Sequence, residues 1–238
     1  MMWWALAAVA AFFVKGLCGF ANTLVFTTIL SFFTLNASIS PVELLLGYPS
    51  NIILAWKERR AVQWKLCLSL AALVIAGSIP GILFLKNMDS GMIKIAFGIV
   101  IILLGLEMLL REFHPVHIKE SRAALLLIGV LSGILCGLYG VGALLGAYLG
   151  RVTDDSSSFK ATICIVFLFE NTLRVVLYVV WGILNLDLMK QAVNLVPFML
   201  IGLCLGMKSS KILDEKVVKK IVIGMLMVSG MALVWNNI

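Results

Sequence analysis

Charged side chains are scarce in this sequence of 238 residues. Asp, Glu, Lys and Arg make up 13% of the chain and hydrophobic residues 62%, whereas soluble domains average about 25% and about 45–50%. A soluble domain of this size buries only about 70–75% of the surface that its unfolded chain exposes. A soluble enzyme, a nucleic-acid binder and a disordered chain are therefore disfavoured, and the composition predicts a protein of the lipid bilayer.

Residue patterns that form disulfide frameworks, metal sites or catalytic centres are also missing. The cysteines lie in or at the ends of apolar runs, are odd in number and form no CxxC pattern. His114 and His117 have no Cys or acidic cluster at ligand spacing, so we expect no metal site and no cofactor. The apolar runs hold no HExxH, GxSxG or paired-Asp arrangement. The sequence therefore does not predict an enzyme.

What the sequence does contain is an internal duplication. Segment 16–20 (GLCGF) resembles segment 134–138 (ILCGL), and segment 77–81 (GSIPG) resembles segment 202–206 (GLCLG). This comparison sets Cys18 opposite Cys136. We predict a first repeat over residues 1–113, a cytoplasmic linker over 114–122 and a second repeat over 123–238.

Each repeat contains one long Gly-rich segment followed by three apolar runs. A helix needs about 20 residues to cross a bilayer, and the runs approach this length: Pro41–Trp56, Leu66–Leu85, Met92–Leu110, Ala161–Ile183, Ala192–Met207 and Val217–Trp235. The Gly-rich segments, Trp3–Leu35 and Ala123–Gly150, are too long for one crossing and too short for two.

The distribution of basic residues favours a re-entrant hairpin for each Gly-rich segment. If both hairpins return to the face they entered from, most Lys and Arg residues fall on one face; if both cross once, the two faces share them almost evenly. The positive-inside rule favours the first arrangement. We predict an all-α integral membrane protein of two inverted repeats, each a re-entrant broken-helix hairpin plus three transmembrane helices. It would lie in a bacterial-type inner or plasma membrane with its basic loops cytoplasmic.

Two broken hairpins that enter from opposite faces would meet near the membrane midplane. Unpaired backbone groups are tolerated there only beside protein or a water-filled cavity, and half-helix N-termini offer a partial positive charge to an anion. This predicts a secondary transporter of a small anion. The alternative is that the glycines only allow helices to pack closely.

Several of these features resemble the TauE/SafE-type sulfite exporter family: the Gly-rich apolar start, the basic turn from Arg59 to Trp64, the Gly/Pro helix at 77–81 and the duplication. The resemblance implies transport of a small anion, commonly sulfite, a sulfonate or another sulfur compound, with the direction of transport open. The expected partners are the bilayer and, as candidates, protons and a second copy of the chain. The first hairpin reads Phe20-Ala21-Asn22-Thr23 where the family has a run of glycines, so the resemblance leaves the anion open.

Charged residues inside apolar runs are candidates for function because a charge at the bilayer centre is costly. Lys15 precedes the first break and would attract substrate, or would extend its side chain to an interface. Glu170 and Arg174 share one helix face. They form a structural ion pair, or Arg174 binds the anion while Glu170 carries a coupling proton or acts as a gate. The matching span of the first copy is expected to be neutral and to break or kink at Pro49.

Uncharged polar residues and glycines complete the predicted substrate site, although each could equally satisfy local backbone groups: Gly19, Asn22, Thr23, Ser50, Asn51, Gly137, Tyr139, Gly140 and Asn171. Cys18 and Cys136 are candidate thiols near the substrate, or small packing residues. A second class of function stays open, a membrane scaffold or assembly subunit without a substrate. Its hairpins would pack solidly, with no polar cavity around Lys15 and Arg174.

Overall fold

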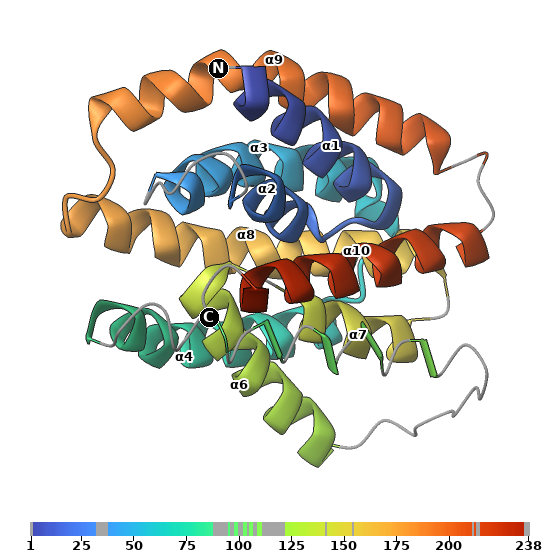
Figure 1. The fold of residues 1–238 in the computed structure, drawn as a ribbon. Helices are drawn as coiled ribbons and strands as arrows, with labels where there is room; N and C mark the ends of the chain where they lie inside the picture. Colours follow the sequence, from blue (N-terminus) through green and yellow to red (C-terminus); the bar gives the residue numbers. More distant parts are fainter. Residues whose placement is uncertain are drawn as a thin grey trace.

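The computed structural model describes residues 2–31, 38–87, 122–140, 142–153, 155–210, 212 and 215–235, with scattered positions between 95 and 110. Every regular element in these ranges is helical (Figure 1). The elements are α1 (Met2–Cys18), α2 (Asn22–Ser31), α3 (Ile39–Lys57), the 3₁₀ helix η1 (Arg59–Ala61), α4 (Trp64–Asn87), α6 (Arg122–Tyr139), α7 (Ala143–Val152), α8 (Ser156–Val180), α9 (Leu186–Ser209) and α10 (Glu215–Trp235).

Three of the described helices are long and apolar enough to cross a membrane: α4 over Trp64–Leu83, α8 and α9. At about 1.5 Å per residue, the 25 residues of α8 extend about 37 Å, more than the roughly 30 Å of a hydrocarbon core. These helices contain the predicted spans Leu66–Leu83 (of Leu66–Leu85), Ala161–Val180 (of Ala161–Ile183) and Ala192–Met207. The predicted span Met92–Leu110 lies mostly outside the described residues. The all-helical membrane class is thus confirmed.

Both Gly-rich segments form a helix, a short break and a second helix. The first break follows α1, with φ +86° at Gly19 and +69° at Ala21; the second follows α6, with φ +70° at Gly140. Glycine adopts this conformation freely, whereas alanine pays about 1–2 kcal/mol for it. Each break closes in the same way: the Gly19 N–H donates to the Lys15 carbonyl and the Gly140 N–H to the Cys136 carbonyl, both at 2.6 Å.

The two breaks match each other in a different register from the one that the sequence comparison predicts. Gly19 and Gly140 occupy similar places at the two breaks, and this match sets Lys15, and not Cys18, opposite Cys136. The sequence comparison set Gly19 opposite Gly137, which lies three residues earlier and is a helical packing residue. The duplication itself stays a prediction.

Two helix pairs enclose the centre of the molecule. α1 packs against α9, and α4 packs against α6. Glycines allow both pairs to approach: a Cβ at Gly206 would lie 2.1 Å from the Phe13 carbonyl oxygen, and one at Gly133 would lie 2.3 Å from that of Val74. Close backbone approach through small residues is typical of helix pairs in membranes. Gly16 and Gly202 do the same between α1 and α9, and Gly77, Gly81 and Gly137 between α4 and α6.

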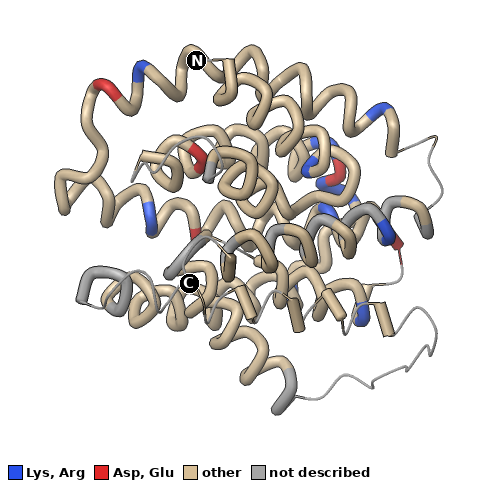
Figure 2. Tube along the Cα trace, in the orientation of Figure 1, with Lys and Arg blue, Asp and Glu red and all other residues tan. Residues whose placement is uncertain are grey.

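α3 and α8 lie between these pairs and run antiparallel (Figure 1). The Tyr48 hydroxyl lies 3.1 Å from that of Thr172, and the Ser40 hydroxyl lies 3.5 Å from that of Tyr178. α3 continues through Pro49, so the chain does not break at this proline, and the alternative of a kink stays a prediction. Figure 2 shows most of the described Lys and Arg residues toward the end of the bundle where α3 and α9 finish.

Candidate functional site

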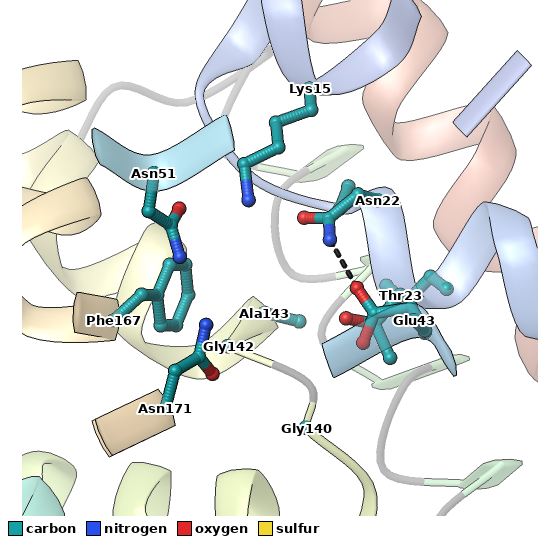
Figure 3. Close-up of a pocket in the computed structure, with 12 residues that line it drawn as sticks. Lys15, Asn22, Thr23, Glu43, Asn51, Gly140, Gly142, Ala143, Phe167 and Asn171 are labelled. Atoms are coloured by element: carbon teal, nitrogen blue, oxygen red, sulfur yellow. Dashed lines mark hydrogen bonds between the residues drawn. The ribbon is translucent and has the colours of Figure 1, made fainter. Parts of the chain in front are cut away.

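A small buried cavity of about 20 Å³ lies where the two breaks meet α3 and α8 (Figure 3). A cavity needs about 10–15 Å³ to hold one water molecule, so this one has room for about one water molecule. Its lining comes from α1 and the first break, from the second break, and from the middle of α3 and α8: Lys15, Ala21, Asn22, Thr23, Leu24, Glu43, Asn51, Gly140, Gly142, Ala143, Phe167 and Asn171.

Lys15 supplies a positive charge to the cavity. Its side chain is 1% exposed and extends from α1 into the space between Asn22 and Asn51 (Figure 3). Among the described residues no carboxylate lies within 4.0 Å of its ammonium group; its one close aromatic neighbour is the Phe12 ring, 5.9 Å away. A buried ammonium without an ion-pair partner is costly, so the cavity is well suited to a negative guest.

The N-termini of two short helices also face the cavity. α2 begins at Asn22 and α7 at Ala143, each directly after its break, and both residues line the cavity. The first amide groups of a helix have no acceptor within that helix, and the helix dipole adds a partial positive charge at this end. Two such ends at one cavity form an anion-binding environment.

Asn51 on α3 and Asn171 on α8 face the cavity from opposite sides (Figure 3). Asn51 is 1% exposed, and its side-chain oxygen has no hydrogen-bond partner in the described part of the chain. A buried acceptor without a partner needs a donor such as a water molecule, whereas the Asn51 side-chain nitrogen is the atom that could donate to an anion. Phe167 packs its ring against Gly142, where a Cβ would lie 2.1 Å from the Phe167 Cζ atom.

Glu43 lines the cavity as well, and the sequence interpretation missed it. The span Pro41–Trp56 was expected to be neutral, but Glu43 lies within it and is 3% exposed. The Asn22 side-chain amide donates to Glu43 Oε1, and Thr23 lies beside the carboxyl group (Figure 3). An acidic residue inside an apolar run was the available signal.

Glu170 and Arg174 lie behind the second break rather than on the cavity surface. Arg174 Nε is 3.7 Å from Glu170 Oε1, and both side chains are at most 2% exposed. Arg174 Nη2 donates to the Ser40 hydroxyl at 3.1 Å and to the Tyr178 hydroxyl at 3.2 Å. A Cβ at Gly140 would lie 2.3 Å from Arg174 Nη1. The guanidinium group therefore braces the break at Gly140.

Other predicted site residues are buried nearby without lining the cavity. Gly19 contacts the Lys160 side chain, and Gly137 packs against the Ser78 backbone. The Ser50 hydroxyl donates to the Gly47 carbonyl at 2.7 Å. The Cys18 thiol lies 3.1 Å from two backbone carbonyls, and Cys136 is fully buried.

The remaining predicted positions fall at the edge of what the structure describes. The Tyr139 side chain, His114 and His117 lie outside the described residues. Within the described ranges no group of three or more His, Cys, Asp and Glu residues could hold a metal ion.

Comparison with known proteins identifies a family. The family model described as sulfite exporter TauE/SafE matches residues 4–233, nearly the whole chain. No curated protein and no solved structure matches. The family is one of membrane transporters, in keeping with the long apolar helices and the buried polar cavity. The chain belongs to the sulfite exporter TauE/SafE family.

Proposed function

We propose that the protein is a secondary transporter that binds a small sulfur-containing oxyanion, such as sulfite or a sulfonate, in the cavity between the two breaks. The observation that carries this proposal is the meeting of two helix N-termini and the buried ammonium of Lys15 at one cavity. Asn51 and Asn171 would complete the shell of amide donors. Such a shell binds an anion through neutral N–H groups and one full positive charge, that of the Lys15 ammonium.

An inverted repeat would provide the alternating access that transport requires. The helix packing supports such a repeat, because the first helix of each half packs against a helix of the other half: α1 against α9, and α6 against α4. The matched breaks at Gly19 and Gly140 and the antiparallel packing of α3 against α8 fit the same relation. The concentration of basic residues at one end of the bundle fits a cytoplasmic placement of that end (Figure 2).

The cavity volume fits an occluded state of such a transporter. Sulfite has four non-hydrogen atoms, whereas about 20 Å³ accommodates roughly one water molecule. One repeat must therefore move relative to the other before the anion can enter or leave. The Gly-lined contacts between α1 and α9 and between α4 and α6 bring backbones together without large interlocking side chains, which favours such sliding.

Glu170 acts as a gate in this proposal. In the closed state it neutralises Arg174, which holds Gly140 in place. Bound anion near the second break would compete with Glu170 for the guanidinium charge. Release of Arg174 from Glu170 would then loosen the break and link occupancy to opening.

Counterflow in proteoliposomes tests the proposal. Vesicles loaded with unlabelled sulfite are expected to accumulate labelled sulfite through the wild-type protein. Lys15→Met and Asn51→Ala should each raise the half-saturating concentration about 10- to 100-fold, because each removes a hydrogen bond worth about 1.5–3 kcal/mol to a charged group. Lys65→Met and Asn194→Ala, which change exposed residues, serve as matched controls. Absence of flux for sulfite, sulfonates and thiosulfate alike would contradict the proposal.

The alternative of a membrane scaffold without substrate predicts solid packing between the breaks. The cavity beside Lys15 favours the transporter. A scaffold would not transport sulfite at all, so Lys15→Met would not differ from the wild type in the counterflow assay.

A further inference from the structure

Among the described residues, Lys160, at 8% exposed, is buried outside the cavity lining. The other buried charged side chains are four: Lys15 and Glu43 line the cavity, and Glu170 and Arg174 pair behind the second break. Two are cations and two are anions, so their formal charges cancel. A bound monoanion would leave this buried region with one uncompensated negative charge. Such a charge is strongly disfavoured away from water. A positive charge must therefore enter with the anion.

Glu43 is better placed than Glu170 to receive that charge. Glu170 already faces Arg174 in an ion pair outside the cavity lining. Glu43 borders the cavity together with the Asn22 and Asn171 side chains, and distances from Gly47, one helical turn further along α3, show how close these three groups lie. A point at the Cβ position of Gly47 lies 3.4 Å from Glu43 Oε1, 3.6 Å from the Asn22 amide nitrogen and 3.9 Å from that of Asn171.

This geometry brings a bound anion against the Glu43 carboxyl group. An oxyanion oxygen that accepts hydrogen bonds from the Asn22 and Asn171 amides would also approach Glu43 Oε1. Two negatively charged oxygens at that separation repel each other. If the carboxyl group carries a proton, its O–H donates to the anion and the contact becomes attractive.

We propose that Glu43 carries one proton together with one monoanion across the membrane, so that the two move in the same direction. The inference rests on the proposed anion site. The proton joins a Glu43 carboxylate oxygen from water while the site is open to one side. It leaves to water on the other side after the anion departs. The buried region is then formally neutral both when loaded and when empty.

The groups that surround Glu43 fit this assignment. Lys15 approaches from α1, Asn22 and Thr23 from α2, and Glu170 and Arg174 from α8. Lys160, also on α8, lies against Gly19 and does not line the cavity. On α9, which also packs against α3, the described charged residues are exposed: Asp187, Lys190 and Lys208. The fixed cations near Glu43 are thus already matched by the two carboxylates.

The decisive experiment compares two modes of transport in one preparation. Counterflow of labelled sulfite needs only binding and alternating access, whereas uptake driven by an acidic exterior needs proton coupling. Wild-type protein is expected to perform both, with one proton entering per monoanion, as reported by a pH dye inside the vesicles. Glu43→Gln is expected to lose the dependence of uptake on the imposed pH gradient, measured relative to the counterflow rate of the same variant. Glu58→Gln, which changes a partly exposed carboxylate paired with Lys57, should keep both.

The outcomes separate this inference from the proposed function. Wild-type counterflow without proton entry, or uptake driven by a sodium gradient instead, would overturn the role of Glu43 and leave the anion site standing. Acid-driven uptake that persists in Glu43→Gln would do the same. Absence of counterflow in the wild type would overturn the anion site itself.

A second variant covers the case in which Glu43→Gln does not fold. Asn22→Ala keeps the carboxyl group and removes its amide donor. It is expected to shift the pH at which uptake is half-maximal, and an unchanged pH profile would count against Glu43.

Discussion

Replacing Gly140 by alanine tests how the second break is held. At φ +70° an alanine pays about 1–2 kcal/mol for the left-handed conformation. Its Cβ would also lie 2.3 Å from Arg174 Nη1, so the guanidinium group must move away from Ser40 and Tyr178. Loss of even one hydrogen bond from a charged donor costs about 1.5–3 kcal/mol. The expected total is about 2.5–5 kcal/mol of unfolding free energy.

Gly182 provides a matched control because it has φ +67° but no atom within 4 Å of the position that a Cβ would occupy. Gly182→Ala should therefore cost only the conformational term of about 1–2 kcal/mol. Unfolding in mixed micelles, followed with a thiol-reactive dye that reports exposure of the buried cysteines, measures both variants. Equal destabilisation of the two variants, with sulfite counterflow preserved in Gly140→Ala, would refute the account of Arg174 as a brace.

Close contacts and burial give three further predictions. Gly133→Ala places a methyl group 2.3 Å from the Val74 carbonyl and should cost at least about 2 kcal/mol of unfolding free energy. Gly224→Ala, with nothing within 4 Å, should be neutral or slightly stabilising, and similar stabilities would contradict the packing role. The methyl group of Gly47→Ala would make ordinary contacts of 3.4–3.9 Å, so the unfolding midpoint should stay within a few degrees of the wild type. The half-saturating sulfite concentration should rise at least tenfold. Unchanged affinity would place the anion elsewhere. Maleimide should label exposed Cys204 rapidly and buried Cys164 slowly in the folded, micelle-solubilised protein. Mass spectrometry of the labelled peptides measures both rates. Fast labelling of Cys164 would contradict the packing around the first break.

The helices and the breaks were predictable from sequence because they depend on local properties. Long apolar runs specify α4, α8 and α9, and the Gly-rich segments predicted two interrupted helices, whose breaks the structure places at Gly19 and Gly140. The register between the repeats was not predictable in the same way. Gly137 and Gly140 are both glycines near the end of one helix, and only the tertiary structure separates the packing residue from the one with positive φ.

The candidate site was predicted in part. Lys15, Asn51 and Asn171 were found because polar groups inside apolar runs need partners. Arg174 was assigned to the substrate, but its position behind Gly140 depends on the packing of α8 against the second break. Glu43 was missed because it lies near the start of its span, where an acid is easily taken for an interfacial residue; the fold of α2 over α3 buries it.

The central claim is that an anion binds between the N-termini of α2 and α7 beside Lys15. Selenite is close to sulfite in shape and charge, and its selenium atom scatters X-rays anomalously. Crystals of the protein soaked in selenite should give an anomalous peak inside the cavity, within hydrogen-bond reach of the Lys15 ammonium and the first amides of α2 and α7. A protein that transports selenite but shows its anomalous peak away from these groups would contradict the account.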